Sequence, residues 1–314
     1  MLERQFGSTD LRVSPLGLGC NNFGVRLDAA AARGIVHAAL DAGITVFDTA
    51  DIYGKRGESE SILGEALGSR RKDVVLVTKF GLAMDEEDQL KGGSARYIAT
   101  AIEASLKRLR TDWIDLYYLH RPDPATQIEE TLRALDALIA QGKVRYIGCS
   151  NMSATQIGEA QRASQANGLH RFVVCQDQYN MLSRQIEAEI IPAIEAHHLA
   201  LVPYFPLASG MLTGKYASGV PIPAGSRMSY LRYSDRFLND ENFRIIEKLR
   251  EFCAKRDRSL LELAFGWLLS KPVVGCVIAG ASTPEQVYQN VAAIDWRLNA
   301  AEMGEVNRLT SKQD

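Results

Sequence analysis

Four side chains of complementary acid–base character follow short apolar runs in the first half of the chain. Asp48 and Tyr53 come after one run, Lys79 ends the next and His120 follows a third. A free tyrosine hydroxyl has a pKa of about 10, which is too high for easy proton exchange at neutral pH. A neighbouring lysine ammonium would lower this pKa, whereas burial alone would raise it. These residue types together predict proton transfer to or from a carbonyl or alcohol oxygen.

Each of the four residues has a role in such a transfer. Asp48 would hold Lys79 charged and in place, and His120 would orient the substrate and share its proton. Tyr53 would be the acid for reducing a carbonyl and the base for oxidising an alcohol. Taken singly, each residue has a structural alternative, such as a turn former, a surface lysine, a loop histidine or a packed aromatic ring. Their arrival at the ends of successive strands favours the functional interpretation.

The apolar runs before these residues have the composition of buried parallel strands. Most are rich in β-branched or aromatic residues and are bounded by Gly, Asp or Pro. Amphipathic stretches such as 98–109 and 128–138 lie between them and predict helices. Asp28, Ser94 and Ser153 are candidate N-caps. The expected strands are Leu16–Cys20, Thr45–Asp48, Val74–Lys79, Ile114–Leu119, Val144–Cys149, Phe172–Gln176, Ala200–Tyr204 and Cys276–Ala279.

Eight strands alternating with helices predict an α/β fold, a (β/α)8 TIM barrel in a single domain over residues 1–314. The eighth strand follows a longer interval than the others, which holds a loop, 208–240, and an extra helix near 241–255. A short N-terminal segment, 3–13, is expected to plug the bottom of the barrel. A doubly wound sheet is the alternative, but one even array of strands favours closure.

The composition argues against several classes of function. Lys and Arg number 36 against 38 Asp and Glu, a net charge of -2, so no basic excess is available for nucleic acid. No apolar run approaches the length of a membrane span, and we expect no signal peptide or anchor. The five cysteines form no CxxC pair, and HExxH is absent, so we expect neither a disulfide frame nor a metal site. A soluble cytoplasmic protein is therefore expected.

The usual nucleotide-binding motifs are incomplete. In the stretch that begins at Gly17, Asn22 stands where the third glycine of the dinucleotide fingerprint belongs. The stretch that begins at Gly210 is one residue short of a P-loop, and Tyr216 follows Lys215 where Ser or Thr is required. A nucleotide would have to bind by other means.

The residues at the strand ends resemble those of the aldo-keto reductases, over essentially the whole chain. The chain is similar to bacterial members with sugar or small-aldehyde activities and to the potassium-channel β subunits of that family. The resemblance rests on Phe47-Asp48-Thr49-Ala50 with Tyr53-Gly54, Thr78-Lys79, Leu119-His120-Arg121-Pro122-Asp123, Gly142-Lys143-Val144-Arg145, Gly148-Cys149-Ser150-Asn151, and Tyr204-Phe205-Pro206-Leu207 with Gly210-Met211-Leu212-Thr213-Gly214-Lys215.

The resemblance implies a monomeric barrel that binds NADP(H) or NAD(H) in extended form. It implies hydride transfer between the nicotinamide and the carbonyl or alcohol carbon of a small aldehyde, ketone or aldose, with Tyr53 as general acid or base. Asp48, Lys79 and His120 complete the implied catalytic tetrad. The implied cofactor-binding residues are Gly19, Cys20, Asn21, Asp48, Ser150, Asn151, Gln176, Tyr204, Phe205, Leu207, Gly210, Leu212, Gly214, Lys215, Arg227, Gly280, Ala281, Ser282, Gln286 and Asn290.

The choice between the two cofactors depends on one departure from the family pattern. Members that prefer NADPH often carry Arg or Lys where this chain has Ser282 or Thr283. Losing such a charge-assisted contact would weaken selectivity for the 2′-phosphate by about 1.5–3 kcal/mol. NADP(H) is slightly favoured, with Lys215 or Arg227 as compensating cations, and use of NAD(H) or of both stays open.

Substrate contacts are expected on the loops at the same rim. Arg121 would meet an acidic or phosphorylated substrate, or would serve as a structural ion-pair partner. The stretch 228–236 is rich in aromatic residues and arginines and would contact substrate or form a solvated loop. Aldoses, pyridoxal and short aldehydes or ketones all remain open as substrates. The candidate contacts are Asn22, Phe23, Tyr53, Phe80, His120 and Arg121.

Two other functions are compatible with these residues. One is a regulatory protein that, like the channel β subunits, senses the redox state of its cofactor with little turnover. The other is a Schiff-base enzyme with Lys79 as nucleophile, which would need a lysine of depressed pKa. Asp48 opposes the second because it would keep Lys79 charged.

Overall fold

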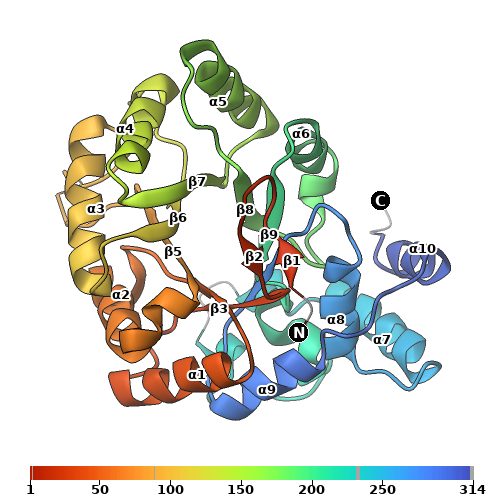
Figure 1. Ribbon diagram of the computed structural model, residues 1–314. Helices are drawn as coiled ribbons and strands as arrows, with labels where there is room; N and C mark the ends of the chain where they lie inside the picture. Colours follow the sequence, from red (N-terminus) through yellow and green to blue (C-terminus); the bar gives the residue numbers. More distant parts are fainter. Residues whose placement is uncertain (2, 88, 231–233, 312–314) are drawn as a thin grey trace.

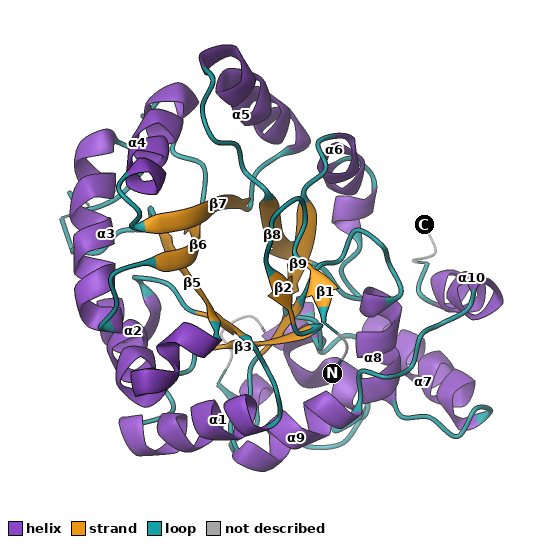
Figure 2. Cartoon of the chain, in the orientation of Figure 1, coloured by secondary structure: helices purple, strands orange, loops and turns teal. Residues whose placement is uncertain are grey.

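Parallel strands and helices alternate along the chain and close into a barrel (Figures 1 and 2). The computed structural model describes all residues except 2, 88, 231–233 and 312–314. Eight parallel strands follow one another in the order β10-β3-β4-β5-β6-β7-β8-β9, each within two residues of its expected bounds. The strands are β3 (Leu16–Gly19), β4 (Val46–Asp48), β5 (Val75–Phe80), β6 (Ile114–Leu119), β7 (Val144–Ser150), β8 (Val174–Gln178), β9 (Ala200–Tyr204) and β10 (Val277–Ala279).

Backbone hydrogen bonds next to β10 close the ring. The Leu201 N–H of β9 donates to the Val273 carbonyl at 2.8 Å, and the Gly275 N–H donates to the Leu201 carbonyl at 2.9 Å. Closure pairs the two edge strands of the sheet, so neither presents a free row of backbone groups. The prediction of a (β/α)8 TIM barrel is confirmed.

Helices surround the strands, and their apolar faces cover the outside of the barrel (Figure 2). The predicted N-caps are present: the side chains of Asp28, Ser94 and Ser153 each accept a backbone N–H of the following helix. Within the described ranges, no helix is both long enough and apolar enough to span a membrane. The helices are α1 (Ala29–Asp41), α2 (Tyr53–Leu67), α3 (Ala95–Leu109), α4 (Ile128–Ala140), α5 (Ala154–Asn167), α6 (Ile190–Ala196), α7 (Asp240–Ala254), α8 (Leu260–Leu269), α9 (Pro284–Ala292) and α10 (Ala300–Leu309).

The long interval before β10 contains the expected loop and the expected extra helix, α7. In its described part, the loop forms three short 3₁₀ turns, η3 (Ala208–Thr213), η4 (Arg227–Ser229) and η5 (Ser234–Arg236). The candidate substrate stretch 228–236 includes residues 231–233, which lie outside the described residues. A further helix, α10, follows α9, and the sequence analysis did not anticipate it.

The N-terminal segment forms a hairpin across one mouth of the barrel (Figure 1). Strands β1 (Arg4–Gln5) and β2 (Arg12–Val13) pair antiparallel, and the segment buries Phe6, Leu11 and Val13. These side chains join inward-facing strand residues in one apolar cluster. The predicted plug is therefore confirmed, and the site must open at the other mouth.

Removing the plug's aromatic ring should destabilise the protein. Phe6 is 1% exposed inside the barrel, so Phe6→Ala should lower the free energy of unfolding by about 3–5 kcal/mol, measured by urea denaturation. Glu3→Ala is the control, because Glu3 lies in an exposed ion pair with Arg12 and should change stability by less than about 1 kcal/mol. A loss of less than about 1 kcal/mol in Phe6→Ala would contradict the role of the plug in the folded core.

Candidate active site

The C-terminal ends of three neighbouring strands and the start of α2 bring the four acid–base residues together. Asp48 ends β4, Lys79 lies near the end of β5 and His120 follows β6, while Tyr53 is the first residue of α2. The Lys79 Nζ lies 2.6 Å from the Asp48 Oδ1 and 4.9 Å from the centroid of the Tyr53 ring. The Tyr53 and His120 rings meet edge to face, with centroids 5.7 Å apart.

The ion pair between Lys79 and Asp48 is buried and fully bonded. Lys79 is 0% exposed and also donates to the Thr49 carbonyl at 2.7 Å. The other carboxylate oxygen of Asp48 accepts a hydrogen bond from the Gln176 Nε2 at 2.8 Å. Burial lowers the pKa of Lys79, but Asp48 and Tyr53 outweigh it, so the net pKa is raised. Lys79 is therefore a fixed ammonium, which does not favour Schiff-base chemistry.

The Tyr53 hydroxyl holds its proton more firmly than the sequence analysis anticipated. Burial raises the pKa of Tyr53, Lys79 opposes the rise, and the net pKa lies above the ordinary value. The expected lowering by Lys79 is present, but the loss of water around the hydroxyl is the larger effect. Tyr53 is thus a protonated phenol at neutral pH, as a proton donor must be.

His120 is held neutral at the same place. Burial, the charge of Lys79 and the charge of Arg121 lower the pKa of His120 to about 2. Its Nδ1 is buried and has no hydrogen-bond partner among the described residues. Buried polar atoms in native proteins are almost always paired. The residue itself contributes to the lining of the cavity, so a ligand bound there can contact the ring, whereas Nδ1 is shielded from it.

Strands β7, β8 and β9 add amide and aromatic groups beside these residues. The Asn151 amide donates to the His120 carbonyl at 3.1 Å and to the Ser150 Oγ at 2.8 Å, and accepts the Tyr204 hydroxyl at 2.8 Å. Asn151 has a φ of 57°, in the left-handed region that Asn tolerates better than most residues. This network fixes the ring of Tyr204 at the edge of the cavity.

Asp48, Tyr53 and His120 line a cavity of about 760 Å³ at the rim of the barrel, and Lys79 is buried beneath them. Most of the other expected site residues also line this cavity. The lining residues among them are Gly19, Cys20, Asn21, Asn22, Asp48, Tyr53, His120, Arg121, Ser150, Asn151, Gln176, Tyr204, Phe205, Leu207, Gly210, Lys215, Arg227, Gly280, Ser282, Gln286 and Asn290.

Besides Lys79, five expected residues do not line the cavity. The rings of Phe23 and Phe80 are buried in the core, where Phe80 packs against Tyr117 with centroids 4.7 Å apart. Leu212 and Ala281 also belong to this core. Gly214 ends η3, and its carbonyl accepts a hydrogen bond from Arg250.

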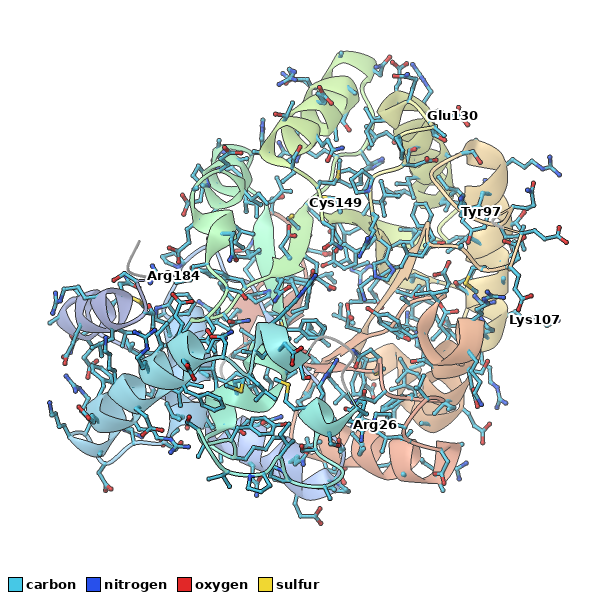
Figure 3. The ribbon with its side chains drawn as sticks, turned by 180° about the vertical axis from the view of Figure 1, so that it is seen from behind. Arg26, Tyr97, Lys107, Glu130, Cys149 and Arg184 are labelled. Carbon is cyan, nitrogen blue, oxygen red and sulfur yellow. The ribbon has the colours of Figure 1, made fainter. Side chains whose placement is uncertain are left out.

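The structure adds residues that the sequence analysis did not single out. Gln289 lies about one helical turn after Gln286 on α9, so helix periodicity could have indicated it. Arg26 has no comparable sequence signal, because it reaches the cavity through contacts with the loop after β9 (Figure 3). The added lining residues are Arg26, Leu82, Pro206, Ser209, Thr213, Ala224, Gly225, Ser226, Leu261, Ile278, Ala279 and Gln289. Tyr230, from the candidate substrate stretch 228–236, also lines the cavity.

The segment after β9 and the residues before α9 also line the cavity. The segment after β9 turns through positive φ angles at Phe205, Ala208 and Ser209. Gly210 has a φ of 98°, a backbone conformation that favours glycine. At the start of α9, Gln286 accepts the Ser282 N–H at 2.8 Å. Among the described residues, no group of three or more His, Cys, Asp or Glu side chains could hold a metal ion.

This combination of fold and site matches a known protein family. A profile of the Aldo/keto reductase family matches residues 15–311, and the chain belongs to that family. It is 40% identical over 304 residues to a probable voltage-gated potassium channel subunit beta of Oryza sativa subsp. japonica, covering 94% of this chain and 92% of the relative. It is 36% identical over 303 residues to the uncharacterized oxidoreductase YrpG of Bacillus subtilis (strain 168), covering 93% and 91%.

A second acid lies behind the site. Asp51 is 1% exposed, its backbone N–H donates to the Lys79 carbonyl at 3.1 Å, and its Oδ2 accepts the Tyr97 hydroxyl at 3.3 Å. Burial and the nearby Glu60 raise the pKa of Asp51 to about 8, against the opposing charge of Arg108. The carboxyl group is thus largely protonated at neutral pH.

This raised pKa predicts a pH-dependent stability. The folded state binds the Asp51 proton more tightly than the unfolded chain, so this contribution declines as the pH rises from about 4 through 8. The free energy of unfolding of Asp51→Asn should therefore increase relative to that of the wild type as the pH rises, by at most about 1.4 kcal/mol per pH unit. Urea denaturation of both proteins at pH 5.5, 6.5, 7.5 and 8.5 measures this difference.

The control for this series is Glu262→Gln. Burial of Glu262 is outweighed by hydrogen bonds from Ser259 and Arg258, which lower its pKa. Its contribution should therefore stay constant over the same pH range. A constant difference between Asp51→Asn and the wild type would refute the protonated state of Asp51.

Proposed function

We propose that the protein is an NAD(P)(H)-dependent oxidoreductase acting on a small aldehyde, ketone or aldose, or on the corresponding alcohol. Membership of the aldo/keto reductase family supports the oxidoreductase class. The observation that carries the proposal is the protonated hydroxyl of Tyr53 beside the fixed ammonium of Lys79, with a neutral His120 facing the same cavity. This is the arrangement that delivers a proton to a carbonyl oxygen.

The lining residues suit a nicotinamide cofactor in an extended pose. The cofactor, when bound, would supply or accept the hydride. Ser150, Asn151 and Gln176 would hold the carboxamide, and the Tyr204 ring would pack against the nicotinamide. The segment 205–215 and Arg227 would hold the pyrophosphate, and residues 280–290 would hold the adenosine. The dipole and free N–H groups at a helix start such as that of α9 favour an anion there.

The chain's own residues would then handle the proton. His120, neutral and part of the cavity lining, would orient the substrate oxygen by a hydrogen bond. Tyr53 would donate its proton to that oxygen during reduction and take it back during oxidation. Lys79 would stabilise the phenolate left behind, since its charge is the interaction that lowers the pKa of Tyr53. Asp48 would keep Lys79 aimed at the hydroxyl.

A second candidate is a regulatory protein that binds the cofactor and turns over slowly. Sequence identities of 40% and 38% to proteins named as probable potassium channel β subunits favour it. Steady-state turnover of simple aldehydes with NADPH or NADH separates the two functions. Turnover at ordinary enzymatic rates, about 1 per second or faster, supports the enzyme; slower turnover with tight cofactor binding supports the regulator.

Replacing the proposed proton donor should abolish turnover and spare binding. Tyr53→Phe should lower kcat by at least about a hundredfold, because general acid catalysis typically contributes that much. Its affinity for NADPH, followed by fluorescence, should change by less than about twofold. Tyr146→Phe is the matched control, since the Tyr146 hydroxyl bonds Asp10 away from the cavity. Near wild-type turnover in Tyr53→Phe would refute the assigned role.

The cofactor choice is tested by restoring the missing cation. Ser282 lines the cavity at the start of α9, and no Lys or Arg occurs in the run 280–284. Ser282→Arg should raise the preference for NADPH over NADH by about tenfold or more, through a charge-assisted contact with the 2′-phosphate. Ser282→Gln, which adds length without charge, should not. An unchanged preference in Ser282→Arg would place the 2′-hydroxyl end of the cofactor elsewhere.

A further inference from the structure

The cavity carries more positive charge than its own acid neutralises. Among the described lining residues, Asp48 is the one carboxylate, and it is already paired with Lys79. A cleft lined by one sign of charge concentrates ligands of the opposite sign. Its occupants should therefore be anionic. The cationic lining residues are Arg26, Arg121, Lys215 and Arg227.

Three of these cations have partners or a proposed role. The Arg26 guanidinium stacks on the Tyr230 ring, 3.5 Å from its centroid. The Arg227 guanidinium faces the Phe205 ring at 4.9 Å. Lys215 and Arg227 belong to the segments proposed to hold the cofactor's phosphates. Their charge is therefore accounted for without the substrate.

Arg121 has no such partner. Its side chain makes no hydrogen bond, ion pair or ring contact within the described part of the chain. The nearby Asp123 is occupied by the Gly93 N–H at 2.8 Å and the Thr126 hydroxyl at 2.7 Å. The alternative of a structural ion pair is thus not realised among the described residues. An arginine left unpaired on a cavity wall is available for a ligand.

The position of Arg121 places it beside the reacting groups. It follows His120 at the C-terminal end of β6, and its charge acts on both His120 and Tyr204. In the strand order, β6 lies four places from β10, on the opposite side of an eight-stranded ring from Ser282 and the start of α9. The segments proposed to hold the cofactor's phosphates follow β9 and β10. Arg121 therefore lines the cavity on the side away from the start of α9.

We propose that the substrate is an aldehyde or ketone that also carries a carboxylate or a phosphate, and that Arg121 binds this anion. This inference rests on the proposed function. The planar guanidinium pairs with either anion through two parallel hydrogen bonds. The anion anchors one end of the substrate while its carbonyl oxygen lies between Tyr53 and His120. A neutral aldehyde lacks this anchor.

Matched substrate pairs test the inference. The first pair is 4-oxobutanoate and its methyl ester, and the second is glyceraldehyde 3-phosphate and glyceraldehyde, each with saturating NADPH or NADH. The wild type should prefer the anion of at least one pair in kcat/KM by about tenfold or more. The pair that carries the preference distinguishes a carboxylate from a phosphate.

Variants assign the preference to Arg121. Arg121→Gln should lower the ratio of anionic to neutral kcat/KM by about 10- to 100-fold, and Arg121→Lys should restore part of it. Arg171→Gln, an exposed arginine just before β8 and outside the cavity lining, is the control and should keep the ratio. Absence of the preference in the wild type, or its survival in Arg121→Gln, overturns the inference.

A binding measurement separates this inference from the proposed function. The same four compounds are titrated calorimetrically into wild type and Arg121→Gln without nicotinamide cofactor, so that no turnover occurs. Arg121-dependent binding of an anion in this titration, together with no turnover of any of the four compounds in the separate assays with NADPH or NADH, supports the anion site and refutes the oxidoreductase. Turnover of neutral aldehydes that Tyr53→Phe abolishes, without an Arg121-dependent preference, keeps the oxidoreductase and overturns the anion site. If neither binding nor turnover is observed, both the anion site and the oxidoreductase are refuted.

Discussion

The buried ion pair between Lys79 and Asp48 is the constraint on which the site depends. Removing both charges from water costs several kcal/mol per ion, and the pair is tolerated only where every remaining bond is made. Here Thr49 and Gln176 complete the set. The pair joins the adjacent strands β4 and β5, and the Gln176 bond reaches it from β8. The complete set of bonds therefore needs strands from different parts of the barrel.

The same low-dielectric floor sets the charge states of the two groups above it. Burial favours the neutral form of any acid or base, and the ammonium of Lys79 adds to this for His120 and opposes it for Tyr53. The results are a neutral imidazole and a protonated phenol next to one fixed positive charge. Because Lys79 keeps its proton, it can stabilise the phenolate that the proposed proton transfer would leave on Tyr53.

The sequence predicted the strands and the rim because both follow from local pattern. Apolar runs ended by Asp48, Lys79 or Leu119 have the length and composition of parallel strands, and parallel strands present their C-terminal ends together. Strand alternation would also have corrected one prediction: Lys79 faces the barrel interior, so the next residue, Phe80, must face the helices. That inference requires only the rule that successive side chains of a strand point to opposite faces of the sheet.

Other features depend on tertiary structure, which no local pattern encodes. The pKa of Tyr53 depends on how much water the folded cavity excludes, and residue spacing gives no measure of that. Arg26 reaches Gly225, 199 positions along the chain, through a loop without regular structure. Gly214, Leu212 and Ala281 belong to segments that pass close to the cavity, but the fold turns them into the wall behind it.

The segment after Tyr53 connects the ion pair to the rest of the fold. Residues 54–57 all have positive φ, including the non-glycine Lys55 and Arg56, for which the left-handed conformation costs about 1–2 kcal/mol each. Gly57 has a φ of 112°, which favours glycine, and a Cβ there would lie 2.6 Å from the Cδ of Arg108.

Arg108 is itself held by the buried Glu60 at 2.6 Å, and Glu60 also accepts the hydroxyl of Thr78, the residue before Lys79. The strained turn that places Tyr53 is therefore bonded to the strand that carries Lys79. Strain persists only where the surroundings over-determine it, and here the same buried charges connect the turn after Tyr53 to the strand that carries the Lys79 ammonium.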